Sequence, residues 1–161
     1  MKKIGAALLI VLMATQLMGL RLSSDSFFDE STITNPDEMP YFTLSDVPPN
    51  TQSFAIIALD PDASNFIHLV AYNIPANEKE IGEHKLLSYG INGWGDTTWG
   101  PLRPPAGKKH HYVFTAYALD LPPNLPTQLS RSELMGAIKG HILATAKMTG
   151  LYEANNSQDT D

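Results

Sequence analysis

The stretch ALDPDASNFIHLVAYNIP, residues 58–75, decides the fold, because it reads as two strands joined by a short acidic turn. A plain hairpin turn needs only residues such as Asn-Gly. This turn instead carries Asp60 and Asp62, and His68 follows inside the second strand. Taken alone, the acids read as turn initiators and His68 as a hydrogen-bonded core histidine. Their meaning depends on what the rest of the chain brings to them.

The remainder of the chain reads as further short strands separated by turns. Apolar, β-branched and aromatic runs alternate with segments dense in Pro, Asp, Asn and Ser, which is typical of a β-rich domain. Residues 87–107 form a long connection with five glycines and both tryptophans. We expect strands over residues 21–27, 41–44, 53–59, 66–75 and 110–122.

One helix is expected over residues 130–150, near the C-terminus. Ser130 and Glu133 fit a capping box, and Gly150 fits the end of a helix. The pattern therefore predicts a mostly β fold with a C-terminal helix packed on the sheet. The predicted helix face consists of Leu134, Ala137, Ile138, His141, Thr145 and Met148.

The first residues differ in composition from the rest. Lys2 and Lys3 precede an apolar run, and residues 1–19 together resemble a secretory signal peptide that is too short for a comfortable membrane span. We therefore expect a periplasmic or secreted protein with no integral membrane span after signal removal. A single domain over 20–153 and a disordered tail over 154–161 complete the expected organisation.

The chain of 161 residues has no cysteine and a formal net charge of −6, so a disulfide framework is excluded. Loss of the two N-terminal lysines would make the balance more negative, and non-specific nucleic-acid binding needs a basic surface. One local exception exists. Arg103, Lys108 and Lys109 lie close in sequence, directly before His110 and His111, and predict an electropositive spot.

Five motifs in a fixed order carry a family resemblance. They are DPDA (60–63), His68 within a strand, IPA (74–76), GPLRPP (100–105) and HHY (110–112). In this order the chain, from about Leu22 to Glu153, resembles the phosphatidylethanolamine-binding protein family, and its bacterial Raf kinase inhibitor-like branch in particular.

The resemblance implies an antiparallel β-sandwich with a small pocket for phosphate, sulfate, acetate or phosphoryl-ethanolamine. The two aspartates would form an acidic lip and His68 the floor, while the Gly-Pro pair and the HHY segment would supply opposite walls. Histidine and tyrosine donors suit such an anion. Carried over residue by residue, the ligand-binding positions are Asp60, Asp62, His68, Gly100, Pro101, His110 and Tyr112.

The chain departs from the family pattern at several of these motifs. Leu69 stands where the family has a tryptophan after the histidine, and DPDAS replaces DPDAP. His111 stands in place of an arginine, so a titratable group replaces a fixed cation. We therefore expect the affinity for anions to fall as the pH rises through about 6 to 7.

Two enzymatic interpretations find little support in the sequence. Three histidines and two carboxylates are possible zinc or iron ligands, but no HExxH motif or paired-histidine spacing occurs. No G-x-S-x-G motif supports a serine hydrolase. We expect no metal, no cofactor and no enzymatic activity. His84 is expected at the surface, and His141 is expected to pack in the helix.

Two functions from different classes follow. The first is a non-enzymatic binding protein of the cell envelope that holds a small anion or a phospholipid head group. The alternative is a protein-interaction module that inhibits a kinase or protease, with Trp94 and Trp99 of loop 90–107 as contacts. Pocket mutations should abolish the first function and loop mutations the second.

Overall fold

The computed structural model describes residues 19–83 and 88–155. The expected signal peptide lies outside this part except for Gly19, as does His84. The expected tail also lies outside it except for Ala154 and Asn155. The carbonyl oxygen of Ala154 accepts a hydrogen bond from the Gly107 N–H at 3.0 Å, so the first residue of the expected tail is bonded to the domain.

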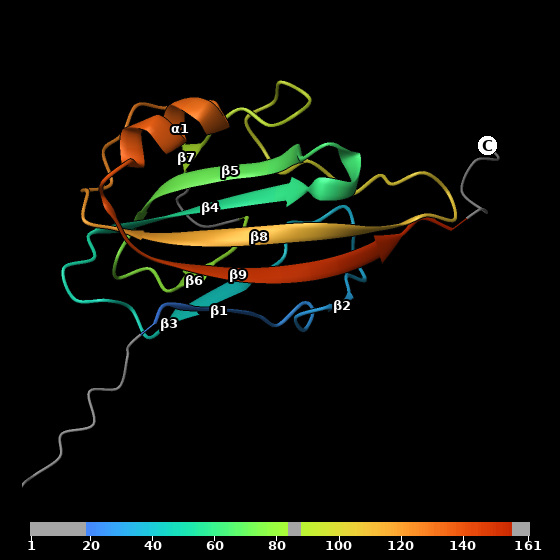
Figure 1. Cartoon of the computed structure of the whole chain (residues 1–161), viewed down its shortest axis with the longest axis horizontal. Coiled ribbons are helices and arrows are strands. Elements are labelled where there is room, and N and C mark those ends of the chain that lie inside the picture. The colour runs from blue at the N-terminus through green and yellow to red at the C-terminus, as the bar shows by residue number, and fades with distance from the viewer. Residues whose placement is uncertain (1–18, 84–87, 156–161) are drawn as a thin grey trace, which may run out of the picture.

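Strands are the main regular structure of the described chain (Figure 1). A short 3₁₀ turn, η1 (Pro61–Ala63), and one α-helix, α1 (Arg131–Ile138), accompany the strands. No helix in this part of the chain has the length and apolar character needed to cross a membrane. The strands are β1 (Arg21–Ser24), β2 (Ser31–Thr32), β3 (Phe42–Ser45), β4 (Ser53–Asp60), β5 (Phe66–Pro75), β6 (Glu80–Ile81), β7 (Ser88–Tyr89), β8 (Lys109–Leu119) and β9 (Ile142–Glu153).

The strands form two sheets. The large sheet has the order β2-β9-β8-β4-β5-β7, and the small one has the order β1-β3-β6. In Figure 1 the small sheet lies below the large one and α1 lies above it. Within the large sheet, β4 pairs antiparallel with both β5 and β8, with Leu59 opposite Val113. This pairing places the β4–β5 turn beside the start of β8.

The centre of the large sheet, at β4, is buried on both faces, which explains the continuous apolar run of this strand. Phe54 and Ile56 belong to the core shared with the small sheet. Ala55 and Ile57 alternate with them and pack in a second cluster that includes Leu134 of α1. A strand covered on both sides needs apolar residues at every position rather than at every second one. Each of the five predicted strand segments contains a strand, although β1 ends at Ser24 and β8 at Leu119, and the helix lying on the sheet is confirmed.

The predicted helix over 130–150 is correct only in its first half. The capping box is present, since the Ser130 N–H donates to Glu133 Oε2 at 2.8 Å and Ser130 Oγ accepts from the Glu133 N–H at 3.2 Å. The helix then ends at Ile138, because Gly140 follows with a φ of +82°, a left-handed conformation typical of helix ends.

Residues 142–150, the second half of that prediction, instead belong to β9, which continues to Glu153 and pairs with the full length of β8. Met148 is buried in the core, whereas Lys147 beside it is exposed, so the true period here is two. Gly150 does not end a helix; it lies in β9, where an added Cβ would come within 2.4 Å of the Ile33 side chain. The expected packing role of His141 is also wrong. Its side chain is half exposed and hydrogen-bonded to Asp120.

Candidate functional site

The acidic turn is a defined structure rather than a flexible link. Asp60 ends β4, and its Oδ1 accepts a hydrogen bond from the Ala63 N–H at 3.0 Å, which caps η1. Ser64 and Asn65 then adopt left-handed φ values of 56° and 60°. A proline is fixed near −65° and could not occupy position 64 in this turn, so the serine of DPDAS suits the local backbone.

Both carboxylates of the turn receive hydrogen bonds from the start of β8. His110 Nδ1 lies 2.7 Å from Asp60 Oδ2 in a buried contact. The next residue, His111, is half exposed, and both its backbone N–H and its Nδ1 bond Asp62 Oδ2, at 2.7 and 2.8 Å. These bonds lower the pKa of Asp62, the backbone N–H being the largest cause. His111 therefore supports the lip through Asp62.

His68 is buried in β5 and is locked to the loop that contains Gly100. Its Nδ1 lies 2.9 Å from the Gly100 carbonyl oxygen, and its own carbonyl oxygen accepts from the Gly100 N–H at 2.8 Å. Because a carbonyl oxygen only accepts, the Nδ1 of His68 carries the proton. Burial lowers the pKa of His68, against the opposing effects of the Gly100 hydrogen bond and of the negative charge on Asp60.

Four aromatic rings surround His68. The ring centroids of Phe66, Trp94 and Tyr112 lie 5.2–5.3 Å from the imidazole, all edge to face, and Trp99 lies 6.2 Å away. The family's tryptophan after the histidine is replaced by the core residue Leu69, so Phe66 and Trp94 supply aromatic surface on the cavity side. An aromatic enclosure of this kind excludes water and favours the neutral imidazole.

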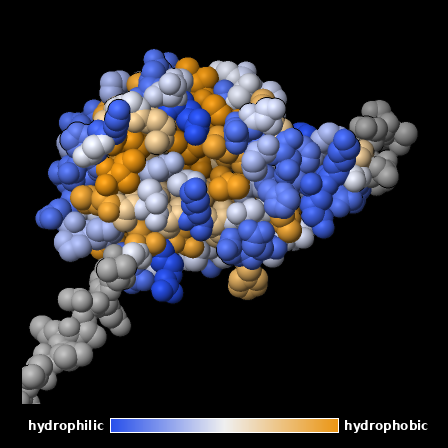
Figure 2. Space-filling model, in the orientation of Figure 1, coloured by the Kyte–Doolittle hydropathy of each residue, from blue (hydrophilic) through white to orange (hydrophobic). Residues whose placement is uncertain are grey.

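A cavity of about 500 Å³ opens at this end of the molecule. It brings together four of the predicted residues, from the β4–β5 turn, β5 and β8. Figure 2 shows hydrophilic residues gathered over the end at which β8 begins and β9 ends. The cavity is lined by Asp60, Asp62, Ala63, Phe66, His68, Trp94, Arg103, Pro105, Lys108 and His110.

The other three predicted residues do not line the cavity but lie behind it. The Gly100 backbone hydrogen-bonds His68, and Pro101 follows it in the same loop. Tyr112 packs against the far side of His68, and its hydroxyl is sealed from solvent with no hydrogen-bond partner among the described residues. Burial, more than the negative charge of Asp60, raises the pKa of Tyr112. The part of these residues in ligand binding stays a prediction.

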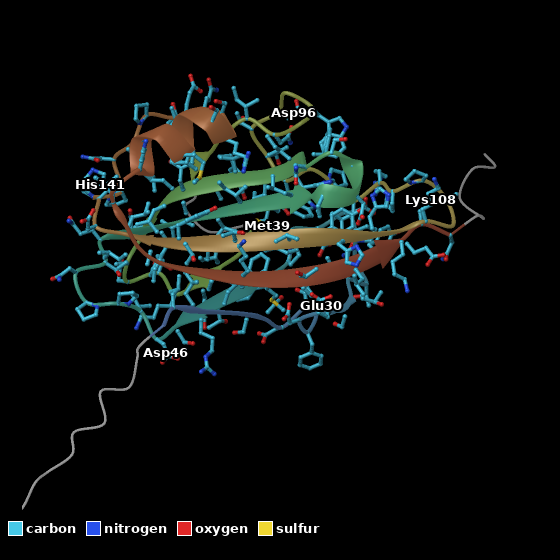
Figure 3. The ribbon with its side chains drawn as sticks, in the orientation of Figure 1. Glu30, Met39, Asp46, Asp96, Lys108 and His141 are labelled. Carbon is cyan, nitrogen blue, oxygen red and sulfur yellow. The ribbon has the colours of Figure 1, made fainter. Side chains whose placement is uncertain are left out.

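The cations of the cavity come from the cluster singled out in the sequence. Arg103 and Lys108 line the cavity, and Arg103 also forms an ion pair with Asp37. Lys109 lines a different hollow beside β9, so it does not join them. In Figure 3, Lys108 lies on the connection that enters β8, at this end of the sheet.

Sequence reasoning missed the apolar wall of the cavity. Phe66 could have been found, because it lies two residues before His68 and therefore on the same face of the strand. Trp94 could not, since its position depends on the loop conformation. The prediction that Trp99 contacts partners is wrong. It is buried and stacks on Phe114 with centroids 6.3 Å apart and an interplanar angle of 16°.

The arrangement is suited to holding an anion. The Nδ1 atoms of His68 and His110 are both committed to protein acceptors, so their Nε2 atoms are the free positions of the rings. A neutral ring offers a lone pair at Nε2, and a protonated ring offers a donor. Within residues 19–83 and 88–155, no three His, Asp or Glu side chains are grouped so as to hold a metal ion.

Comparisons with known proteins agree with this geometry. Residues 23–153 match the family described as phosphatidylethanolamine-binding protein. The UPF0098 protein of Aquifex aeolicus is 35% identical over 133 residues, which cover 76% of this chain and 78% of that protein. The UPF0098 protein of Chlamydia muridarum is 35% identical over 123 residues, covering 71% and 81%.

Two solved structures share the fold. A phosphatidylethanolamine-binding protein homologue from Chlamydia trachomatis superposes with a TM-score of 0.80 at 29% identity, covering 86% of this chain and 99% of that chain. YbcL of E. coli, a member of the mammalian family, superposes with a TM-score of 0.76 at 27% identity, covering 84% and 99%.

Proposed function

Because the chain belongs to the phosphatidylethanolamine-binding protein family, we propose that it is a non-enzymatic binding protein of the cell envelope. Its ligand is a small anion or a phospholipid head group of the phosphate or phosphoethanolamine type, held in the cavity between His68 and His110. The observation that carries the proposal is this cavity, which is lined by two imidazoles and two cationic side chains.

The charged groups of the cavity have different roles in binding. Arg103 and Lys108 attract an anion from solution, and the imidazoles below them donate to it from Nε2 once protonated. Asp62 accepts a hydrogen bond from His111, and Asp60 accepts hydrogen bonds from Ala63 and His110. These donors reduce the electrostatic repulsion between the two carboxylates and a bound anion. Asp60 and Asp62 can also accept from the ammonium group of an ethanolamine.

Isothermal titration calorimetry with phosphoethanolamine and inorganic phosphate tests this proposal. Replacing the exposed Lys108 by alanine, and the buried His68 by glutamine, should each weaken binding about tenfold, since each removes one charge-assisted hydrogen bond. The matched control is His141→Gln at the opposite end of the sheet. Wild-type affinity in both cavity variants, with folding confirmed by circular dichroism, would overturn the proposal.

The envelope location rests on residues 1–19 alone. Cell fractionation of the full chain and of a chain lacking these residues tests it. The full chain should appear outside the cytoplasm and the shortened chain inside it. Equal distribution of the two chains would remove this part of the proposal.

Trp94 favours a second candidate function, the inhibition of a kinase or protease by loop 90–107. Its side chain is 48% exposed, which is unusual for so large an apolar group. Trp99 no longer contributes to this surface. Purified kinases and proteases, assayed with wild-type protein and Trp94→Ala, test the function. It requires inhibition that the tryptophan variant loses and the Lys108 variant keeps.

A further inference from the structure

We propose that Phe66 and Trp94 form a second subsite, beside the anion position, for an apolar or aromatic substituent of the bound anion. The ligand class is then a phosphate monoester with such a substituent, rather than inorganic phosphate. The inference rests on the proposed function, because it takes the anion to lie between His68 and His110.

The two rings build a continuous apolar corner. They meet edge to face with centroids 4.5 Å apart and an interplanar angle of 73°. Each also contacts His68, so the corner lies directly against the imidazole. Both rings line the cavity, together with the apolar residues Ala63 and Pro105. An anion held at His68 would therefore have its substituent against aromatic carbon.

The loop that carries Trp94 is held by one buried side chain. Asn92 Oδ1 accepts from the backbone N–H groups of Trp94 and Asp96, at 2.9 and 3.0 Å, and its Nδ2 donates to the Thr98 carbonyl oxygen at 3.1 Å. Figure 3 shows Asp96 at the outer side of this loop. Trp94 is thus an exposed ring on an internally bonded loop, which lowers the entropy lost when a ligand covers the ring.

Two glycines make room for the rings. A Cβ added at Gly100 would lie 2.2 Å from Trp94 Cζ3, and a Cβ added at Gly93 would lie 2.4 Å from Phe66 Cζ. Any other residue at these positions would displace the rings from the cavity wall. The glycines at the two ends of the sequence G-W-G-D-T-T-W-G therefore leave the space in which the rings form the corner.

The size of the cavity agrees with a ligand larger than a bare anion. Its volume of about 500 Å³ falls in the range of about 300–1,000 Å³ that pockets for small organic ligands occupy. The free protein leaves nearly half of Trp94 exposed, and a ligand substituent would cover that surface. Burial of aromatic area in an edge-to-face or stacked contact stabilises the complex.

Calorimetry with three probes, phenyl phosphate, phosphoethanolamine and inorganic phosphate, tests the subsite. In the wild type, phenyl phosphate should bind about tenfold more tightly than inorganic phosphate. Trp94→Ala should bring this ratio close to one, and Trp94→Phe should restore most of it. Phe28→Ala is the matched control, because Phe28 is an exposed aromatic residue that lies outside the cavity.

The outcomes separate the two proposals. Equal affinity of the wild type for phenyl phosphate and phosphate would overturn the subsite and leave the anion pocket standing. A proportional loss of all three probes in Trp94→Ala would also overturn it, because Trp94 would then shape the whole pocket. If no probe binds the wild type, the proposed function and the subsite both fail.

Discussion

The two ends of β8 carry the same chemical pair in different surroundings. At its start, His110 bonds Asp60 at 2.7 Å; just past its end, Asp120 bonds His141 at 2.8 Å. Figure 3 labels His141 at the end of the molecule opposite Lys108. The side chains of the first pair are 11% and 4% exposed, and those of the second are 45% and 41% exposed.

The difference lies in the walls rather than in the hydrogen bond. The first pair is buried in the wall of a cavity that two aromatic rings and two cations also line, whereas the second is open to water. Low dielectric surroundings strengthen a hydrogen bond and raise the cost of leaving one of its partners unpaired. A histidine and an aspartate 2.8 Å apart are therefore not a binding site unless the fold encloses them.

The largest difference in stability between the two ends is expected when the aspartate of each pair is removed. Asp60→Ala leaves the Nδ1–H of His110 buried without an acceptor and removes the cap of η1, so the free energy of unfolding should fall by about 3 kcal/mol. Asp120→Ala at the open end should cost about 0.5 kcal/mol or less. Urea-induced unfolding measures both, and equal losses would show that burial does not distinguish the two ends.

Acid should act on the cavity end through His68. Its pKa is lowered in the folded state, so the unfolded chain binds more protons between that lowered pKa and the ordinary 6.5. Stability is then fully present above about pH 6.5 and falls on acidification, by at most about 1.4 kcal/mol per pH unit. Unfolding in buffers free of phosphate and sulfate should show this slope in the wild type and in His141→Gln. A wild-type slope in His68→Gln would assign it to another group.

Anion affinity should depend on pH in the opposite direction to stability. Because Nε2 of His68 donates only when its imidazole is protonated, and the pKa of His68 lies below its usual 6.5, sulfate affinity should fall as the pH rises toward 6.5. Sulfate is the suitable probe, since its own charge stays constant over this range. Constant affinity between pH 5 and 8 would contradict a role for the cavity histidines in binding.

The smallest effect is expected at the lip. His111→Ala keeps the backbone N–H that bonds Asp62, the largest cause of the lowered pKa of that carboxyl. Only a half-exposed side-chain pair is lost, so stability should change by no more than about 0.5 kcal/mol, as for His141→Ala. If thermal or urea unfolding shows a loss of stability above about 1.5 kcal/mol, this half-exposed pair contributes to stability as a buried pair does.

Most of the strands, and the grouping of four of the predicted residues around one cavity, could be predicted from the sequence. The run over 53–59 has to be apolar throughout because both faces of β4 are covered, and the turn after it has an unmistakable Asp-Pro signal. The end of the helix is harder to predict, since residues spaced four apart lie on one face of a strand as well as of a helix. Met148 is buried in either reading, and the left-handed Gly140 decides between them.

The exposure of the two tryptophans lay beyond sequence reasoning. Trp94 and Trp99 occupy one loop of similar composition, yet one ring stacks in the core and the other lines the cavity. The conformation of this loop depends on contacts such as those of Asn92, whose side chain bonds three of its backbone groups. The spacing of apolar residues in the sequence does not predict such a contact.

Two hydrogen bonds between Gly100 and His68 join the loop behind the cavity directly to the floor of the cavity. Displacing this loop would break the hydrogen bond that His68 Nδ1 donates to the Gly100 carbonyl oxygen. That bond is one of the interactions that raise the pKa of the ring against the effect of burial.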